Sequence, residues 1–113
     1  MNIPREFKEH KAELILNNEL FLILNWRNPK NSEYAIRYIL DKTWGTLIIE
    51  GDLGHAIARW WNKIEPEEII NIIKNDESYF KSKFQCSSDF SGPRINLWIK
   101  GFELSYKNAI KAA

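Results

Sequence analysis

The sequence has a single cysteine, Cys86, and therefore no second cysteine for an internal disulfide. It also lacks long apolar runs: the longest, residues 20–24, is far shorter than the roughly 20 residues that cross a bilayer. The N-terminal segment MNIPREFKEHK carries no apolar run typical of a secretory signal peptide. We therefore expect a cytoplasmic protein in a reducing compartment, with no membrane partner.

An excess of charge of one sign is also missing, with 16 Lys and Arg against 15 Asp and Glu and a formal net charge of +1. This balance excludes a global electrostatic attraction to nucleic acid or to an anionic membrane. Locally the charges separate: residues 64–77 hold five acids and one lysine, and residues 78–113 hold six bases and two acids. Such asymmetry is more typical of two solvated helix faces than of a binding site.

The chain of 113 residues has the length of one domain, and we assign residues 1–113 to it. With 44% hydrophobic and 27% charged residues, the composition is that of a folded globular protein rather than a disordered or membrane-embedded one. A domain of this size supports a modest core and leaves little room for a deep active-site cavity.

The first half of the chain is expected to contain one helix followed by strands. An apolar stripe predicts a helix over residues 5–17, and β-branched and aromatic residues predict strands over residues 20–26 and 44–50. Residues 33–40 and 55–61 alternate as strands do, and a short helix remains the alternative for both.

The second half is expected to be helical. Pro66, followed by acidic residues, predicts the start of one helix. The side chain of Asp76 is expected to cap a second helix, which carries Tyr79, Phe80 and Phe84 towards the core. The composition of residues 87–93 indicates a loop, and residues 94–113 predict a last helix, interrupted or bent near Gly101. A run of strands followed by helices indicates an α+β fold: an N-terminal helix, a three- to four-stranded antiparallel meander sheet, and C-terminal helices packed on one face. The other face would be exposed or used for binding.

The glycine-rich turn at residues 51–54 is the first candidate for chemistry, because the backbone N–H groups of such turns can cradle phosphate. The segment has neither the GxxxxGK[ST] nor the GxGxxG pattern, and no lysine follows it. We interpret Gly51, Asp52 and Gly54 as a structural turn in which the glycines supply positive φ and Asp52 bonds its own backbone. No cofactor is expected.

Candidates for catalysis are weak. The residue types of a cysteine-nucleophile site occur in the chain, as Cys86, His55 and either Asp52 or Asp89. No sequence signature surrounds the cysteine, and the two histidines form no metal-ligand pair, so no metal site is expected. Glu50 and Asp52 could belong to a metal-dependent nuclease, although the glycine between them favours a turn. We expect a protein that is not an enzyme, with a metal-dependent nuclease left open.

Five tryptophans are the strongest compositional signal, since a small domain must bury such large rings or present them to a partner. Trp60 and Trp61 are adjacent, so their side chains point in opposite directions on a strand and about 100° apart on a helix. Both rings are therefore hard to bury on one face. We expect Trp61 either to anchor a protein–protein interface or to be partly buried.

The stretch LIIEGDLGHAIARWW, followed further along by DESYFKSKFQCSSD, resembles a group of small proteins carried by phages and integrated mobile elements. The shared pattern is a strand ending in GDxG, an alternating strand ending in tryptophan, a helix, and DxxYFxxK before a small polar turn. The resemblance covers residues 44–90 and matches these positions: Gly51, Asp52, Gly54, Trp60, Asp76, Tyr79, Phe80, Lys83 and the turn at residues 85–88. It attaches no catalytic role to them.

The resemblance implies an accessory protein that acts on host machinery in the bacterial cytoplasm, the class that includes anti-CRISPR proteins. We expect it to bind and inhibit a host defence protein or ribonucleoprotein, with a CRISPR effector as the favoured target, by occlusion rather than turnover. The residues expected to contact the partner are Arg59, Trp61, Glu65, Glu67 and Glu68, with Asp52 forming the turn beneath them. The acids in residues 64–77 could locally mimic nucleic-acid phosphate.

Two alternatives stay open. A small nucleic-acid-binding or regulatory protein would use the basic C-terminal surface, which includes Lys100, Lys107 and Lys111. The exposed sheet face could instead form a homodimer.

Overall fold

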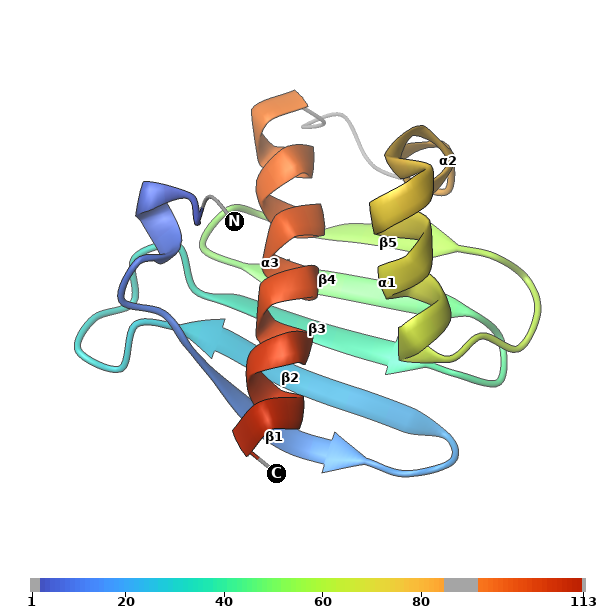
Figure 1. Cartoon of the computed structure of the whole chain (residues 1–113), viewed down its shortest axis with the longest axis horizontal. Helices are drawn as coiled ribbons and strands as arrows, with labels where there is room; N and C mark the ends of the chain where they lie inside the picture. The colour runs from blue at the N-terminus through green and yellow to red at the C-terminus, as the bar shows by residue number, and fades with distance from the viewer. Residues whose placement is uncertain (1–2, 85–91, 113) are drawn as a thin grey trace.

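Five antiparallel strands form one sheet in which every strand pairs with its neighbours in the sequence, in the order β1-β2-β3-β4-β5 (Figure 1). The computed structural model describes residues 3–84 and 92–112. The strands are β1 (Lys11–Asn17), β2 (Phe21–Arg27), β3 (Ile36–Asp41), β4 (Thr46–Gly51) and β5 (Ala56–Arg59). Short connections explain the order, because antiparallel neighbours need only a turn between them.

The helices lie together on one face of this sheet (Figure 1). After a short 3-10 turn, η1 (Arg5–Phe7), the helical elements are α1 (Pro66–Asn75), α2 (Glu77–Ser82) and α3 (Gly92–Ala112). This arrangement confirms the predicted α+β class. The helices formed by residues 3–84 and 92–112 are too short or too polar to cross a bilayer.

The prediction of a helix over residues 5–17 is wrong, because only Arg5–Phe7 form a helical turn and Lys11–Asn17 form β1. A bulge shifts the pairing register of β1 between Leu14 and Leu16. The bulge interrupts the two-residue alternation that marks a strand, so the sequence also fits a helical stripe. Pairing with β2 decides for the strand, and the sheet has five strands rather than three or four.

Residues 33–40 and 55–61, which fitted either a strand or a short helix, contain the strands β3 and β5. In β3 the side chains of Ile36, Tyr38 and Leu40 are buried and the alternate ones are not. The predicted helix starts are confirmed: Pro66 is the first residue of α1, and Asp76 caps α2 by accepting the Tyr79 N–H. The predicted loop over residues 87–93 falls mostly outside the described residues.

α3 runs without interruption past Gly101, so the predicted break there is wrong. A Cβ atom at Gly101 would lie 2.3 Å from the hydroxyl oxygen of Tyr38 on β3. That hydroxyl is buried and donates a hydrogen bond of 2.7 Å to the carbonyl oxygen of Trp98. The glycine therefore permits close packing of α3 on the sheet.

α2 closes the core beside β5. Phe80 is fully buried, as predicted, and its ring meets Trp60 edge to face with centroids 5.3 Å apart. Phe84 stacks on Phe80 and forms an isolated β-bridge with Ala58. Tyr79, also predicted to point towards the core, is exposed.

The turn at residues 51–54 joins β4 to β5 as expected, and Gly51 and Gly54 have positive φ angles of 147° and 104°. The role expected for Asp52 is wrong, because its carboxylate accepts the N–H of Tyr34 at 3.0 Å instead of bonding its own turn. The backbone N–H of Asp52 in turn donates to the Ala35 carbonyl oxygen. Asp52 thus ties this turn to the chain entering β3.

Candidate interaction surface

The sheet has a second face that the helices leave uncovered. In the part of the chain that the structure describes, α1, α2 and α3 all lie on the opposite face (Figure 1). We call this uncovered surface the open face. Cross-strand pairing aligns five aliphatic side chains across it, here called the aliphatic row: Leu16, Ile23, Ile39, Ile48 and Ile57. Such a continuous apolar strip on a small protein is typical of an interaction site.

Aromatic side chains border the aliphatic row at one end of the strands. Phe21, Trp44 and Trp61, which we call the aromatic end, line a shallow pocket together with Arg59 and the neighbouring row residues. Trp44 is 64% exposed and Trp61 is 62% exposed. Burying such large rings against a partner is the commonest source of hot-spot energy in protein interfaces.

Trp61 is held in an unusual backbone conformation, with a φ of 62°. Bulky side chains rarely adopt the left-handed region, which costs on the order of 1–2 kcal/mol. The guanidinium carbon of Arg59 lies 4.8 Å from the Trp61 ring centroid, so a cation–π contact holds the exposed ring in place. Backbone strain that keeps a large apolar ring in water is typical of a binding site.

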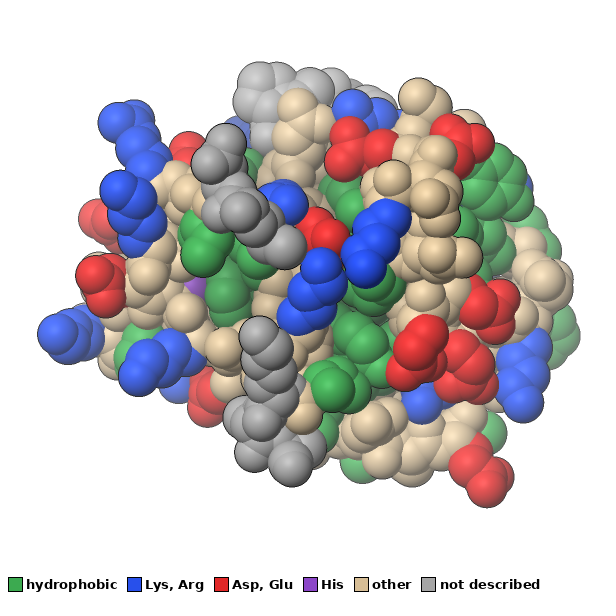
Figure 2. Space-filling model, viewed as in Figure 1, with side chains coloured by type: hydrophobic (Ala, Val, Ile, Leu, Met, Phe, Trp, Pro, Cys, Tyr) green, Lys and Arg blue, Asp and Glu red, His purple; other side chains and the backbone are tan. Residues whose placement is uncertain are grey.

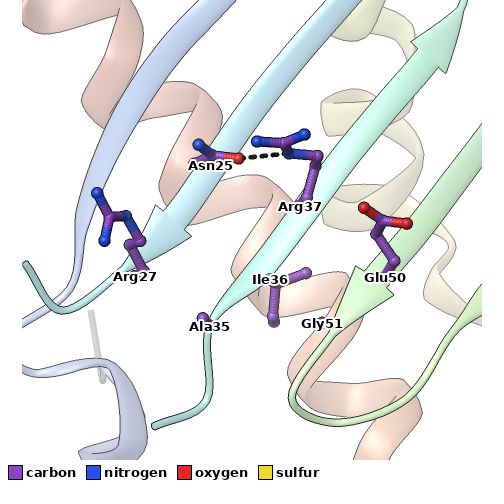
Figure 3. A pocket seen from close by; sticks show the side chains of 7 residues that line it. All are labelled: Asn25, Arg27, Ala35, Ile36, Arg37, Glu50 and Gly51. Carbon is purple, nitrogen blue, oxygen red and sulfur yellow. Dashed lines mark hydrogen bonds between the residues drawn. The ribbon is translucent and has the colours of Figure 1, made fainter. Parts of the chain in front are cut away.

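Polar side chains border the aliphatic row at the opposite end. Asn25, Arg37 and Glu50 are neighbours on β2, β3 and β4, and we call them the polar end (Figure 3). The Nε of Arg37 donates to the Asn25 side-chain oxygen at 2.8 Å. Glu50 is exposed on the strand next to Arg37, where opposite charges attract.

An ion pair flanks the polar end on β1 and β2. The Nε of Arg27 lies 2.8 Å from a carboxylate oxygen of Glu13. This hydrogen bond lowers the pKa of Glu13 and raises the pKa of Arg27. Because both side chains are solvated, the pair adds little stability and leaves the face close to neutral.

Both edges of the sheet are partly engaged, which limits strand addition by a partner. On β5, the N–H of Arg59 donates to the Lys83 carbonyl oxygen, and Ala58 forms the bridge with Phe84. On β1, the Asn108 side chain accepts the Ala12 N–H at 3.0 Å, and the bulge distorts the strand beyond it. Bulges and covered N–H groups discourage edge-to-edge pairing, so the open face is the more suitable docking surface.

Comparisons with models of known protein families, with curated proteins and with solved structures found no match to this chain.

The structure brings together two of the five residues predicted to contact a partner, Arg59 and Trp61, on the open face. Glu67 and Glu68 lie instead in the first turn of α1, on the helical side of the sheet. Glu65 is the residue before α1, and Asp52 lies at the opposite end of the strands from Trp61. Asp52 is therefore not beneath the predicted contacts.

The three glutamates have structural partners. The Glu65 and Glu68 side chains form a capping box at the start of α1, and Glu65 also lies 3.8 Å from the buried ammonium of Lys42. The hydroxyl of Tyr106 on α3 donates to the Glu67 carboxylate. Burial raises the pKa of Tyr106, and the bond to Glu67 raises it further. Substituting these acids would therefore disturb helix packing as well as any contact with a partner.

Of the residues considered for catalysis, the structure describes Glu50, Asp52 and His55. Glu50 is exposed on the open face, and Asp52 is bonded to the Tyr34 backbone. Cys86 and Asp89 lie outside the described residues, so the structure does not place the cysteine against His55. Among residues 3–84 and 92–112, no three His, Cys, Asp or Glu side chains are grouped to hold a metal ion.

The basic C-terminal surface is partly neutralised within the described residues. The buried carboxylate of Glu103 bonds Lys100 at 3.0 Å and Lys107 at 3.1 Å. Figure 2, viewed from the helical side, shows basic and acidic side chains intermixed over α3 and α1. The described side chains of this face therefore carry charges of both signs, whereas nucleic-acid binding surfaces are predominantly basic.

Glu103 provides a test of that ion-pair arrangement. Burial alone would raise the pKa of Glu103, but the hydrogen bonds from Lys100 and Lys107 outweigh it and lower the pKa below the ordinary value of 4.5. The stabilisation is therefore fully present above pH 4.5 and is lost as the pH falls through the lowered pKa. We expect Glu103→Gln to lower the free energy of unfolding by about 1 kcal/mol at pH 7, and by less in acid.

Urea denaturation from pH 7 down to pH 3 measures this effect. The matched control is Glu77→Gln, because Glu77 forms a solvated pair with Lys81 and its loss should change stability by less than about 0.5 kcal/mol. An equal effect of Glu103→Gln at all pH values would show that the lysines do not stabilise the carboxylate.

Sequence reasoning missed Trp44 and the aliphatic row. Alternation along residues 36–41 places Arg37, Ile39 and Asp41 on one face, which was a usable signal. The alignment of Ile39 with Ile23 and Ile48 depends on register, which no single segment reveals.

Proposed function

We propose that this protein is a non-catalytic binding protein that acts by docking its open face on a partner protein. The observation that carries the proposal is the aliphatic row bordered by the exposed rings of Trp44 and Trp61. A partner that covers these side chains removes a contiguous apolar surface from water, which is favourable by roughly 25 cal/mol per Å². The polar end and Arg59 would then orient the partner.

The partner we propose is a host defence nucleoprotein complex, with a CRISPR effector as the favoured target. The support for this choice is the resemblance of residues 44–90 to small proteins of phages and mobile elements. Trp60, Asp76 and Phe80 in that pattern build the core and helix start that hold the neighbouring Trp61 and Arg59. Inhibition by occlusion needs a docking surface and no catalytic group.

Replacing Trp61 should abolish partner capture without unfolding the protein. Asparagine is suited to the positive φ of this position, so Trp61→Asn should change the free energy of unfolding by less than about 1 kcal/mol. Loss of an interface tryptophan costs about 2 kcal/mol or more, so affinity should fall by about 30-fold or more. Affinity capture from a bacterial lysate, followed by mass spectrometry and titration against the recovered complex, measures this.

The matched control is Tyr79→Ala. Tyr79 is another exposed aromatic residue with a cation over its ring, Lys83 at 4.6 Å, but it lies on α2 in the helical layer. The proposal requires a defence effector that the wild type and Tyr79→Ala recover and Trp61→Asn does not. Recovery of the same proteins by all three baits, or of nucleic acid alone, would contradict it and favour the basic surface.

A further inference from the structure

β3, the central strand, carries a self-complementary pattern of side chains on the open face. Arg37, Ile39 and Asp41 occupy alternate positions of this strand and therefore share one face. Ile39 is the middle residue of the aliphatic row, with Ile23 and Ile48 as its cross-strand neighbours. A base and an acid thus lie at equal distances, about 7 Å, on either side of a central isoleucine.

Two twofold arrangements can bring a pair of these faces together. With the axis along β3, each Arg37 would meet Arg37 of the second copy, and each Asp41 would meet Asp41. With the axis across the strands, each Arg37 meets Asp41 of the second copy, and Ile39 meets Ile39. The charges therefore oppose the first arrangement and favour the second.

The rest of the face fits the second arrangement. Each strand lies over its own copy in reverse, so Ile23, Ile48 and Ile57 stack on their equivalents and the two aliphatic rows coincide. The aromatic end of each copy then covers the polar end of the other. Trp44 follows β3, so its ring comes near the second copy's Arg37, and guanidinium groups pack favourably on indole rings.

We propose that, in the absence of its partner, this protein forms a homodimer through the open face, with strands antiparallel about Ile39. The inference rests on the proposed function, because it takes the open face as the docking surface and assigns its occupant in the free protein. The partner and the second copy would both contact the aliphatic row and the aromatic end. Partner binding must therefore dissociate the dimer, and dimerisation keeps the apolar face covered until then.

The size of the face sets the expected strength of the dimer. Five strands spaced about 4.8 Å apart, each about 20 Å long, give a footprint on the order of 500 Å² per copy. Stable complexes bury about 800 Å² per partner, so the interface belongs to the weak, reversible class. We expect dissociation at micromolar concentrations, which allows a tighter partner to displace the second copy.

Sedimentation velocity of the purified protein at concentrations from about 1 to 500 µM tests the inference, since this range spans a micromolar dissociation constant. Arg37→Asp and Asp41→Arg should each weaken the dimer at least tenfold. The double variant should recover most of the lost affinity, because it reverses the same intermolecular pair. Lys74→Glu, an exposed charge change on α1, is the control and should leave the dimer unchanged.

Asp41 needs a second variant because its Oδ1 accepts the N–H groups of Thr43 and Trp44 in the turn after β3. Asp41→Asn keeps an oxygen for these bonds and removes only the charge, so it should fold normally and still weaken the dimer severalfold. Circular dichroism of every variant verifies the fold.

The outcomes separate this inference from the proposed function. A protein that is monomeric throughout the concentration range, yet loses its partner in Trp61→Asn, would overturn the dimer and leave the open face to the partner. If neither Arg37→Asp nor Asp41→Asn weakens the dimer, the interface lies elsewhere and the inference is also overturned. If the charge variants weaken the dimer as expected but Trp61→Asn still captures the partner, the dimer stands and the proposed function is wrong.

Discussion

Gly101→Ala is expected to lower the free energy of unfolding by about 2 kcal/mol, although alanine is the better helix former. In the interior of a helix, replacing glycine by alanine gains about 1 kcal/mol from propensity alone. Here the new methyl group would lie 2.3 Å from the buried Tyr38 hydroxyl oxygen, a distance that two such atoms cannot share. The steric cost therefore exceeds the propensity gain, because α3 must move off the sheet or Tyr38 must shift.

A double-mutant cycle with Tyr38→Phe identifies the cause. Tyr38→Phe alone loses the hydrogen bond to the Trp98 carbonyl oxygen and should cost about 1 kcal/mol. It also removes the atom that the methyl group would meet, since the next nearest atoms, on Ile36 and Phe7, lie 3.4 Å away. The double variant should therefore be more stable than Gly101→Ala alone.

Urea denaturation followed by circular dichroism gives the four free energies that the cycle needs. The cycle provides its own control, because the gain in helix propensity from Gly101→Ala is the same whether position 38 is tyrosine or phenylalanine. A Gly101→Ala protein more stable than the wild type, or a double variant in which the two losses simply add, would contradict the close approach of α3 and β3.

Phe80→Ala should be the most damaging single change, with a loss of about 3–5 kcal/mol in the free energy of unfolding. Phe80 is fully buried and contacts both Trp60 and Phe84 through its ring. Its removal leaves a cavity between α2 and β5 that large, constrained rings cannot fill. Because a small domain has roughly 5–15 kcal/mol of total stability, this loss is a large part of it.

Tyr79→Ala is the matched control for this change as well. The two aromatic residues are adjacent on α2, but Tyr79 is exposed and should contribute less than about 0.5 kcal/mol. Tryptophan fluorescence during denaturation reports the transition, since Trp60 lies against the altered position. Equal effects of the two substitutions would show that α2 does not pack on the sheet through Phe80.

The position of Phe80 links stability to the open face. Trp60 is buried against Phe80, and the next residue, Trp61, presents its ring on the other side of the sheet. Packing of one ring thus sets the backbone from which the second projects. The sequence indicated that Trp60 and Trp61 could not both be buried on one face. In the structure the ring of Trp60 lies on the helical side of the sheet and the ring of Trp61 lies on the open face.

The candidate site was only partly predictable. Trp61 was expected as an interface anchor on general grounds, and the structure places it with Arg59 on the open face. The glutamates at positions 65, 67 and 68 were also expected to contact the partner, because a count of charges cannot distinguish a contact residue from a helix-capping residue. Glu65 and Glu68 complete the start of α1, and Glu67 holds Tyr106, so much of their role is intramolecular.

The sequence by itself determined the features that depend on neighbouring residues. Pro66 and Asp76 start helices, Gly51 and Gly54 adopt positive φ, and the run of strands followed by helices defines the α+β class. Each of these follows from local sterics, hydrogen bonding within a few residues, or the periodicity of one segment. No distant part of the chain is needed to settle them.

Only the tertiary structure decided the features that depend on contacts between distant segments. β1 is a strand because β2 pairs with it, and Gly101 is needed because Tyr38 lies beneath α3. The aliphatic row exists because four pairing registers align side chains from five strands, with Trp44 and Trp61 brought to one end. A shift of one residue in any register would move a whole strand's side chains to the other face, and local sequence does not specify that choice.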